Sequence, residues 1–306
     1  MAMKGISIIV PLYNKEETIC NCLDKILDQT IDSYEVIVVD DGSTDNSVAN
    51  IQKYKDRITL LHQENQGPSV ARNTGAENST MPCLAFVDAD DEISPDFVEC
   101  HLSVRQAVPE VELSINSFKV YENNELKNTE YLFDRCNVKK PDENFFIPDE
   151  FNHEYVINVH SGGYCVNKDI FLKASGFDEV LKCWEITDAL TRFSLLSGKI
   201  AIINDVLSVK FNTVNSQFLL EKDNLEYQQQ YCDNILEVIE KIPDHSKSRY
   251  FKEIRSLCYA YWKTLKFNDL VRLYKKTTAI PSARVYFTLP VKIRMVAEFL
   301  KFFYPK

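Results

Sequence analysis

No apolar run in the sequence is long enough to cross a membrane, so we expect no transmembrane segment in this chain. Residues 1–5 lead directly into a short apolar run and lack the pattern of a cleavable signal peptide. Glycine is scarce, with 8 in 306 residues, and 45% hydrophobic with 26% charged residues is ordinary for a soluble globular protein. We therefore expect one large domain or two smaller ones, in the cytoplasm or held peripherally on the cytosolic face of a membrane.

Positive charge is also in short supply. The formal net charge of -10 argues against a general nucleic-acid surface, although an acidic chain can still bind phosphates through a metal ion. The nine cysteines lack the paired spacing of a zinc site, since Cys20 and Cys22 are separated by one residue and the others are scattered. An odd number without a disulfide pattern predicts reduced thiols in a reducing compartment.

What the sequence does contain is a concentrated group of carboxylates at the end of an apolar run. Residues 82–87 are short, apolar and bounded by turn formers, which predicts a buried strand that ends at Asp88 and Asp90. Side chains two positions apart point the same way in such a stretch, and their repulsion is relieved by a hard cation such as Mg²⁺ or Mn²⁺. The alternative is an acidic loop that caps a helix beginning near Pro95.

Apolar and amphipathic segments alternate before this stretch. The pattern predicts strands at residues 6–10, 35–39, 58–61 and 83–87, and helices at 14–29, 45–55 and from about 69. Asn14, with a Glu three residues later, suggests an N-cap for the first helix. This order implies an α/β fold with a mostly parallel sheet covered by helices on both faces. Ligands bind such sheets beyond the carboxyl ends of the strands, where polar clusters stand at residues 11–14, 40–43 and 88–91.

Each polar cluster suggests a contact with a flat, phosphorylated ligand. The Asp41 carboxylate can accept a hydrogen bond from a pyrimidine imide, and Tyr13 can stack on the ring. Arg72, about one turn into a helix, can reach a base carbonyl or a phosphate. In the alternative interpretation, Tyr13 is a rim aromatic, Asp45 caps a helix, and Arg72 forms a salt bridge with a nearby carboxylate.

Four segments together resemble the successive signatures of family 2 glycosyltransferases with the GT-A fold. They read SIIVPLYN at 7–14, EVIVVDDGSTD at 35–45, NQGPSVARN at 65–73 and FVDADD at 86–91. The resemblance covers about residues 4–100, resumes more weakly with GFDE at 176–179, and lapses after about 212. It implies a GT-A Rossmann-like, mostly parallel mixed sheet in a catalytic domain at 1–212, followed by a helical region at 213–306.

The resemblance also implies a donor site and a reaction. The residues that would bind the nucleotide sugar are Pro11, Tyr13, Asn14, Asp41, Arg72, Asp88 and Ala89. Asp90 would hold a Mn²⁺ or Mg²⁺ ion that bridges the diphosphate. The implied activity is transfer of a sugar, with inversion, from a nucleoside-diphosphate sugar to a glycan or lipid-linked hydroxyl, and family habit together with Asp41 favours a UDP-sugar. Surface polysaccharide biosynthesis is the expected setting.

Catalysis requires a base, which in the family comes from a Glu-Asp pair at a helix start. The matching residues here are Glu185 and Ile186, followed by Asp188 and Arg192 in register. Isoleucine cannot accept a proton, so three possibilities remain open. Glu185 replaces the base, Asp188 reaches in from the next turn, or the chain is a catalytically impaired nucleotide-sugar-binding homologue or partner subunit. Both acids also suit a helix N-terminus electrostatically, without any catalytic role.

The middle of the chain is less distinctive. Residues 111–121 and 126–133 are expected to form strands, and 167–174 a helix. His153 and His160 suggest a metal or catalytic role, although a single histidine is more often an ordinary polar contact. A nucleotidyltransferase, which would share the acidic metal residues, is disfavoured because no Gly-rich phosphate loop follows the first strand.

The C-terminal region is predicted to be helical at 219–242, 246–266 and 291–303. Its apolar positions suit packing against the catalytic domain or against a second subunit in a homo-oligomer. The last segment interleaves aromatic residues with Arg284, Lys292, Arg294 and Lys301. Such a basic amphipathic helix can lie on an anionic membrane, and the alternative is a helix docked on the protein core.

Overall fold

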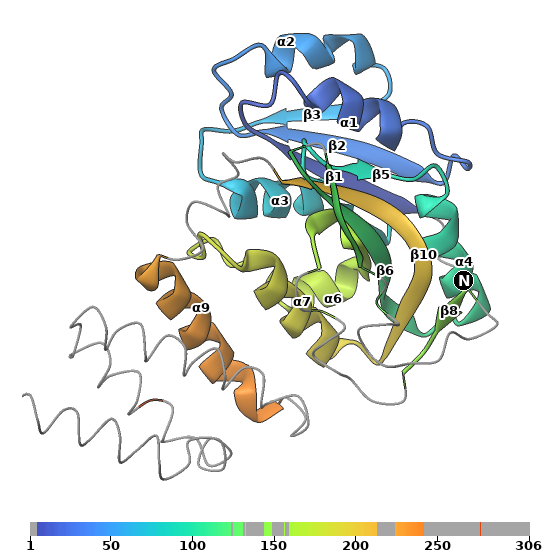
Figure 1. Cartoon of the computed structure of the whole chain (residues 1–306), viewed down its shortest axis with the longest axis vertical. Helices are drawn as coiled ribbons and strands as arrows, with labels where there is room; N and C mark the ends of the chain where they lie inside the picture. The colour runs from blue at the N-terminus through green and yellow to red at the C-terminus, as the bar shows by residue number, and fades with distance from the viewer. Residues whose placement is uncertain are drawn as a thin grey trace, which may run out of the picture. The chain divides into compact units, whose positions relative to one another are not determined.

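The computed structural model describes residues 5–123, 125–130, 132, 144–148, 156, 159–212, 224–241 and 276 (Figure 1). The chain divides into two compact units, residues 1–221 and 222–306, which are described separately. The predicted domain boundary follows Asn212, the last residue of the last strand in the first unit. Residues 213–223 lie outside the described residues, so that boundary stays a prediction.

The first unit is built on one sheet, whose strand order is β3-β2-β1-β4-β9-β6-β10-β5, with β7 paired to β6 and β8 paired to β10. The strands are β1 (Ile6–Leu12), β2 (Tyr34–Asp40), β3 (Thr59–His62), β4 (Cys83–Phe86), β5 (Glu92–Ile93), β6 (Val111–Glu122), β7 (Glu125–Glu130), β8 (Phe145–Phe146), β9 (Tyr164–Asn167) and β10 (Lys199–Asn212). β1 is parallel to both β2 and β4, whereas β9 runs antiparallel between β4 and β6. The mostly parallel mixed sheet expected from the sequence is confirmed.

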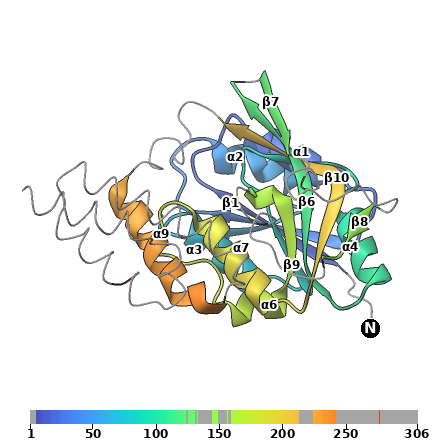
Figure 2. The same cartoon turned by 60° about the horizontal axis from the view of Figure 1, so that its bottom comes forward.

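Helices cover both faces of this sheet (Figures 1 and 2). One face packs against α1 (Ile19–Ile26), α2 (Ser47–Ile51) with the short η1 (Gln52–Tyr54), and α4 (Phe97–Ala107). The other packs against α3 (Pro68–Glu77), α6 (Lys168–Lys173) and α7 (Glu185–Leu196). Ile8 of β1 belongs to the first core and its neighbour Ile9 to the second, because successive side chains of a strand point to opposite faces.

The prediction of a helix from Asn14 is wrong at both ends. α1 begins at Ile19 and ends at Ile26, and Asn14 has a left-handed backbone with φ of 51°. The Asn14 side chain accepts hydrogen bonds from the backbone N–H groups of Thr44 (2.8 Å) and Asp45 (3.3 Å) instead of capping a helix. A contact across 30 residues therefore replaces the local contact that the cap pattern predicts.

Other boundaries differ less. β6 covers the predicted strand at 111–121, and β7 ends at Glu130, before the predicted end at 133. In the second unit, α9 (Leu225–Val238) and the short η4 (Ile239–Lys241) fall within the predicted helix at 219–242. The side chain of Asn224 caps α9 by accepting a hydrogen bond from the Glu226 N–H at 2.9 Å.

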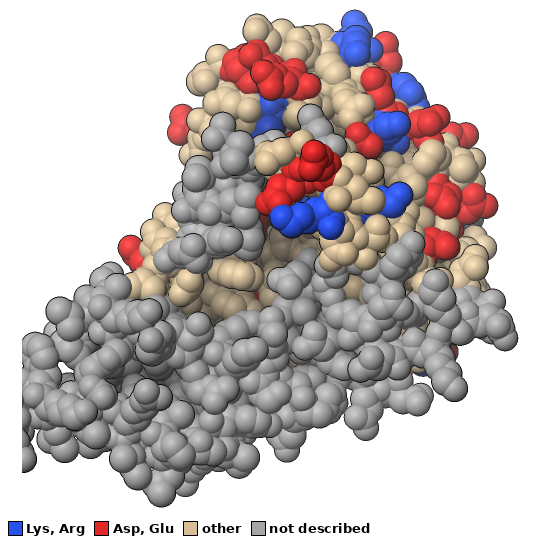
Figure 3. All heavy atoms as spheres, in the orientation of Figure 1, with Lys and Arg blue, Asp and Glu red and all other residues tan. Residues whose placement is uncertain are grey.

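Several predictions lie outside the described residues. These are His153, the helices at 246–266 and 291–303, and the basic aromatic segment that suggests membrane contact. Within the part of the chain that is described, no helix combines the length and the apolar character needed to span a bilayer. On the face shown in Figure 3, acidic and basic side chains are interspersed over the described surface.

Candidate active site

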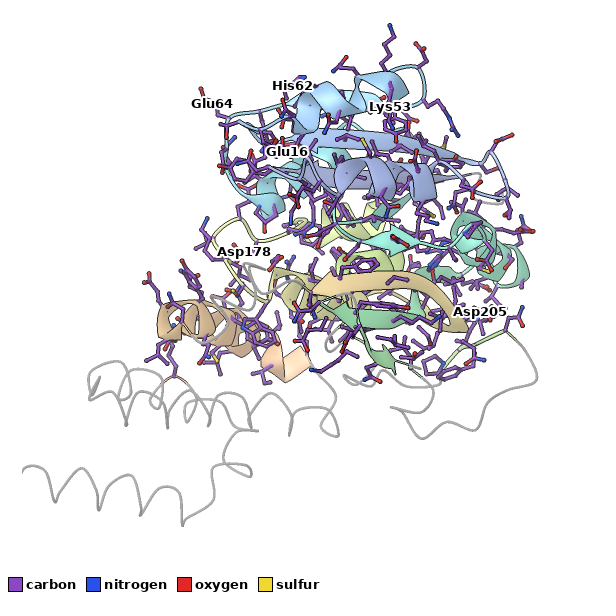
Figure 4. All side chains as sticks on the ribbon, turned by 45° about the horizontal axis from the view of Figure 1, so that its top comes forward. Glu16, Lys53, His62, Glu64, Asp178 and Asp205 are labelled. Carbon is purple, nitrogen blue, oxygen red and sulfur yellow. The ribbon has the colours of Figure 1, made fainter. Side chains whose placement is uncertain are left out.

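The loops after β1, β2 and β4 bring together most of the residues that the sequence indicates. Parallel pairing of these three strands places their carboxyl ends at one edge of the sheet. Glu16, Glu64 and Asp178 mark this edge in Figure 4, and Asp205 lies at the opposite one. The predicted clusters at 11–14, 40–43 and 88–91 are therefore neighbours in space.

Asp41 is buried, and its carboxylate organises the loop that leads into α3. Oδ1 accepts hydrogen bonds from the Gln63 side chain (2.7 Å) and the Gln66 N–H (2.9 Å), and Oδ2 accepts one from the Gly67 N–H (2.8 Å). An ionised carboxylate offers about four acceptor positions, so these bonds leave room for about one more donor. The predicted contact with a base is therefore compatible with this geometry only as a single hydrogen bond.

The loop after β1 is fixed to the loop after β2. Pro11 pairs with Val39 in the sheet, and the Asn14 N–H donates a hydrogen bond to Ser43 Oγ at 3.1 Å. Tyr13, which lies between Pro11 and Asn14 in the sequence, is 45% exposed. An exposed ring on a fixed backbone beside Asp41 suits stacking on a flat ligand.

Arg72 is the residue around which the site is arranged. Its side chain is 3% exposed and forms ion pairs with Asp88 through Nη2 (2.7 Å) and with Glu185 through Nη1 (3.3 Å). Burial disfavours the charge of Arg72, but the negative charges of Asp88 and Glu185 outweigh burial and raise its pKa. The salt bridge that the sequence offered as the alternative role of Arg72 is therefore present, and it joins two predicted site residues.

The carboxyl of Asp88 responds in the opposite direction. Burial favours its neutral form, but the charge of Arg72 and the hydrogen bond from Arg72 lower the pKa of Asp88 to about 2. The Asp88 side chain is 33% exposed, so one side of this carboxylate remains open to a ligand. Its neighbour Ala89 is buried and belongs to the core beneath the turn.

Asn73 connects the Arg72 helix to the segment at 176–179. Its Nδ2 donates to the Phe177 carbonyl (3.0 Å) and to Glu179 Oε1 (3.0 Å), and its Oδ1 accepts from the Phe177 N–H (2.9 Å). The Phe177 ring lies 5.3 Å from the Arg72 guanidinium carbon, a cation–π distance. Gly176 has φ of +63°, and a Cβ there would lie 2.6 Å from Asn73 Oδ1. The weak resemblance at GFDE therefore marks a segment that is docked against α3.

Asp90 is paired with Lys15, a residue that the sequence analysis did not single out. Their side chains form a short ion pair, and Asp90 is 24% exposed. Burial and the charge of Asp91 raise the pKa of Asp90 above its usual range, with Lys15 opposing them. Burial also disfavours charge on Lys15, but the pull of Asp90 raises the pKa of Lys15.

The described residues contain no cluster of three or more His, Cys, Asp or Glu side chains that could bind a metal ion. A single carboxylate still fits Mg²⁺ or Mn²⁺ when the remaining ligands are substrate phosphates and water. Asp90 fits as this single carboxylate, because burial and the charge of Asp91 disfavour its ionised form and a bound cation would stabilise that form.

The two candidate bases differ in their surroundings. Glu185 is 18% exposed, and its Oε1 contacts Arg72. Asp188 is buried, and its Oδ2 accepts hydrogen bonds from Arg192 Nε (2.9 Å) and Nη2 (2.6 Å). Arg192 in turn donates to the Gly176 carbonyl at 2.7 Å, so Asp188 helps to hold the 176–179 segment. The structure brings Glu185 to Arg72 and leaves Asp188 in a separate salt bridge.

Glu185 is the first residue of α7 and follows a residue with an unusual backbone conformation. The preceding Trp184 is left-handed, with φ of 68°, which is uncommon for a bulky residue. Such conformations persist only where surrounding contacts fix them. Ile186 is partly buried and packs against the hydrophobic core. The residue at the position of the family's base therefore contributes to packing.

His160 is buried and lies beside the acidic turn. Its Nδ1 is 3.2 Å from Asp91 Oδ2, and its Nε2 is 2.8 Å from Ser208 Oγ. Of the two histidines singled out in the sequence, His160 is therefore a polar contact of the carboxylate cluster. Sequence patterns could not pair His160 with Asp91, because 69 residues separate them.

Comparison with known proteins gives consistent results. The sequence model described as Glycosyl transferase family 2 matches residues 7–146. The glycosyltransferase GlyG of Streptococcus pneumoniae serotype 4 is 30% identical over 217 residues, which cover 66% of this chain and 69% of GlyG. The uncharacterized glycosyltransferase YibD of Escherichia coli (strain K12) is 45% identical over 97 residues, but these cover only 31% of this chain and 28% of YibD.

Solved structures agree in fold. TarS 1-349 of S. aureus in complex with UDP-GlcNAc matches with a TM-score of 0.65 at 20% identity, over 90% of this chain and 82% of the TarS chain. The mannosyltransferase PcManGT from Pyrobaculum calidifontis, in complex with GDP-Man and Mn²⁺, matches with a TM-score of 0.58 at 18% identity, over 99% of this chain and 81% of PcManGT. The GT-A fold predicted from the sequence is confirmed.

Proposed function

Because the chain belongs to glycosyl transferase family 2, we propose that it transfers a sugar from a nucleoside-diphosphate sugar to an acceptor hydroxyl, with inversion. The observation that carries the proposal is Arg72, whose guanidinium contacts both Asp88 after β4 and Glu185 at the start of α7. The Arg72 guanidinium thereby holds Asp88, the proposed donor-binding carboxylate, next to Glu185, the proposed catalytic base. Transfer needs these functions side by side, because the acceptor oxygen attacks the carbon that the diphosphate leaves.

The donor in this proposal is a UDP-sugar. Tyr13 would stack on the base, and Asp41 would accept its imide N–H in the acceptor position that the protein leaves open. Pro11 and Asn14 would set the backbone around the base, whereas Asp88 and Ala89 would contact the ribose or the sugar. Support comes from the shared fold of TarS, which is solved with UDP-GlcNAc, although PcManGT of the same fold binds GDP-Man.

Asp90 would hold a divalent cation together with the diphosphate. When bound, Mn²⁺ or Mg²⁺ neutralises charge that develops on the departing diphosphate. PcManGT, which is solved with Mn²⁺, supports the choice of ion. Lys15 would leave Asp90 for a phosphate oxygen, because an ammonium group pairs with either anion at this exposed edge.

Glu185 is the proposed base. Its Oε1 faces Arg72, and among the residues that the structure describes none donates a hydrogen bond to Oε2. Oε2 would accept the proton of the acceptor hydroxyl as that oxygen attacks the anomeric carbon from the face opposite the diphosphate. Arg72 would keep the Glu185 carboxylate oriented for this step. Asp188 would support the site through Arg192 and not take part in proton transfer.

The acceptor in this proposal is a glycan or a lipid-linked saccharide, as in surface polysaccharide biosynthesis, and the protein works at the cytosolic face of a membrane. The sequence of the last segment, basic and aromatic, supports this assignment. Co-sedimentation with anionic liposomes tests it. We expect the full chain to pellet and a chain ending at residue 282 to stay in solution, and equal pelleting would contradict membrane binding by this segment.

A second candidate is a nucleotide-sugar-binding homologue or partner subunit without turnover. Ile186 favours it, since the family's base position is occupied by a side chain that packs on the core. Both candidates bind the donor and only the transferase releases the nucleoside diphosphate.

The experiment that separates them has two steps. Unfolding temperatures are measured with a panel of UDP- and GDP-sugars, with and without Mn²⁺, because a ligand of the native state raises stability by mass action. Release of the nucleoside diphosphate is then measured for the stabilising donor, in the wild type and in Ile186→Asp. A transferase releases it in the wild type, whereas donor binding with release only in Ile186→Asp would identify the second candidate.

A further inference from the structure

The turn that carries Asp88 and Asp90 is anchored by a third carboxylate, Asp91. The Asp91 N–H donates to the Asp88 carbonyl at 2.9 Å, which closes the turn. The Asp91 side chain is 3% exposed, and its Oδ1 accepts a hydrogen bond from the Phe211 N–H of β10 at 3.0 Å. Its Oδ2 lies 3.2 Å from His160 Nδ1. The position of the two site carboxylates therefore depends on how firmly Asp91 is held.

The His160 ring is also packed closely by its neighbours. The Phe118 ring lies 4.8 Å from it, between ring centres. A Cβ added at Gly162 would lie 3.1 Å from His160 Cε1, and one at Gly163 would lie 2.7 Å from Val159 Cγ1. The two glycines thus let the chain at 161–163 fold closely around the imidazole. The ring has little freedom to rotate away from Asp91.

Hydrogen-bonding capacity assigns the proton of this imidazole. A carboxylate only accepts, so His160 Nδ1 donates its hydrogen to Asp91. Ser208 Oγ accepts a hydrogen bond from Asn116 Nδ2 at 3.0 Å and is the hydrogen-bond partner of His160 Nε2 at 2.8 Å. Both ring nitrogens of His160 are therefore paired with buried partners.

The chain of hydrogen bonds continues through the core of the protein. Asn116 Oδ1 lies 3.1 Å from His101 Nε2, and His101 Nδ1 lies 2.6 Å from Ser114 Oγ. Arg105 Nη1 donates to the same Ser114 hydroxyl at 2.7 Å. Burial lowers the pKa of His101 to about 3, so a neutral ring donates to Asn116 and accepts from Ser114. A continuous buried network, which runs from α4 through β6 and β10, thus ends at Asp91.

We propose that His160 is a positioning residue of the donor site, which holds Asp91 through Nδ1 and thereby fixes the turn that presents Asp88 and Asp90 to the donor diphosphate. The inference rests on the proposed function, because it assigns those two carboxylates to donor and metal binding. Hydrogen-bond partners of this indirect kind usually change ligand affinity or activity by about 10- to 100-fold when removed. His160 makes no contact with the substrate in this account.

Two substitutions of His160 distinguish positioning from general support of the fold. The amide nitrogen of Asn lies near the place of imidazole Nδ1, and that of Gln near the place of Nε2. His160→Asn therefore keeps the bond to Asp91 and loses the one to Ser208, whereas His160→Gln does the reverse. Ser208→Ala is the matched control, because it removes the Nε2 partner and leaves Asp91 held.

The measurement is calorimetric affinity for UDP-GlcNAc and GDP-mannose with Mn²⁺, well below each variant's unfolding temperature, together with kcat and KM for the donor. We expect His160→Gln to bind the donor that the wild type selects about 10-fold more weakly or worse, with a raised KM. The donor affinities of His160→Asn and Ser208→Ala should stay within about 3-fold of the wild type, even if their unfolding temperatures fall as far as that of His160→Gln.

Equal donor affinity in His160→Gln and Ser208→Ala would overturn the role of His160. Should His160→Gln not fold, Phe118→Leu loosens the ring and keeps both hydrogen bonds. It should weaken donor affinity by a smaller factor, and unchanged affinity in that variant would overturn the proposal. A wild type that binds neither of these donors nor any other member of the UDP- and GDP-sugar panel would overturn the proposed function itself, which is a different result from a wild type that binds while His160→Gln is unaffected.

Discussion

Arg72 Nη2 donates a hydrogen bond of 2.7 Å to Asp88 Oδ1, and this contact sets the charge state of the donor side of the site. Nη1 of the same guanidinium donates a hydrogen bond to Glu185 Oε1 at 3.3 Å. Because Arg72 is buried, the two carboxylates are held by a charge that solvent barely screens.

Arg72→Lys should reduce kcat/KM for the donor by about 100-fold, because a single ammonium cannot hold two carboxylates in fixed directions. Steady-state kinetics with a saturating acceptor would measure it. Arg57→Lys is the matched control, since Arg57 donates to the Leu27 carbonyl on another part of the unit. Comparable losses in both variants would contradict the central place of Arg72.

Asp88 should make stability depend on pH in the acid range. Its folded pKa of about 2 lies below the unfolded value, which is about 3.9. The ionised form is therefore favoured by folding, so the contribution is present above about pH 4 and is lost as pH falls towards 2. Partial exposure reduces it to about 1 kcal/mol.

Urea unfolding of the wild type and Asp88→Asn at pH 6 and pH 3 measures this contribution. We expect the difference in unfolding free energy between the two proteins to shrink at pH 3. Asp56→Asn, a substitution at an exposed position, serves as the control. A difference that does not change with pH would show that the Arg72 contact contributes no such stability.

Asp90→Asn should stabilise the protein at neutral pH while weakening its response to Mn²⁺. Burial and Asp91 raise the folded pKa of Asp90, so stability is lost as pH rises through that value, and the neutral amide avoids the loss. Thermal unfolding at pH 7 should show a higher midpoint for Asp90→Asn than for the wild type. Mn²⁺ with UDP should raise the midpoint of the wild type more, and an equal rise in both proteins would exclude Asp90 as the ligand.

Asn73→Ala should lower the unfolding free energy by about 2 kcal/mol, because it leaves the backbone groups of Phe177 without their partners. Asn78→Ala is the matched control, since the Asn78 side chain donates its hydrogen bond to the Thr74 carbonyl of the same helix, α3. Denaturant unfolding of both variants gives the comparison. Similar small losses would mean that the 176–179 segment is not held by Asn73.

The sequence predicted the elements whose signals are local. Alternating and continuous apolar runs located β1, β2 and β4, and the polar residues after them were expected at one edge because parallel strands share direction. The family resemblance assigned Arg72 and Asp88 to one donor site, and the two side chains are in contact. The GT-A fold and the family follow from those same short segments.

Long-range contacts could not be predicted in the same way. The Asn14 side chain was expected to cap a helix, but its partners are 30 and 31 residues away. The pairs Lys15 with Asp90 and Arg72 with Glu185 span 75 and 113 residues. Periodicity carries no information on such pairs, because they depend on the order of strands in the sheet and on the antiparallel insertion of β9.

The most direct test of the account is the rate of sugar transfer in wild type, Glu185→Gln and Asp188→Asn, measured at equal occupancy of the nucleotide-sugar donor. Glutamine keeps the shape of Glu185 and cannot accept the proton, so we predict a loss of about 100-fold or more in kcat with donor affinity near that of the wild type. Asp188→Asn should lose stability through Arg192 and keep a larger share of its turnover. Full turnover in Glu185→Gln would contradict the account.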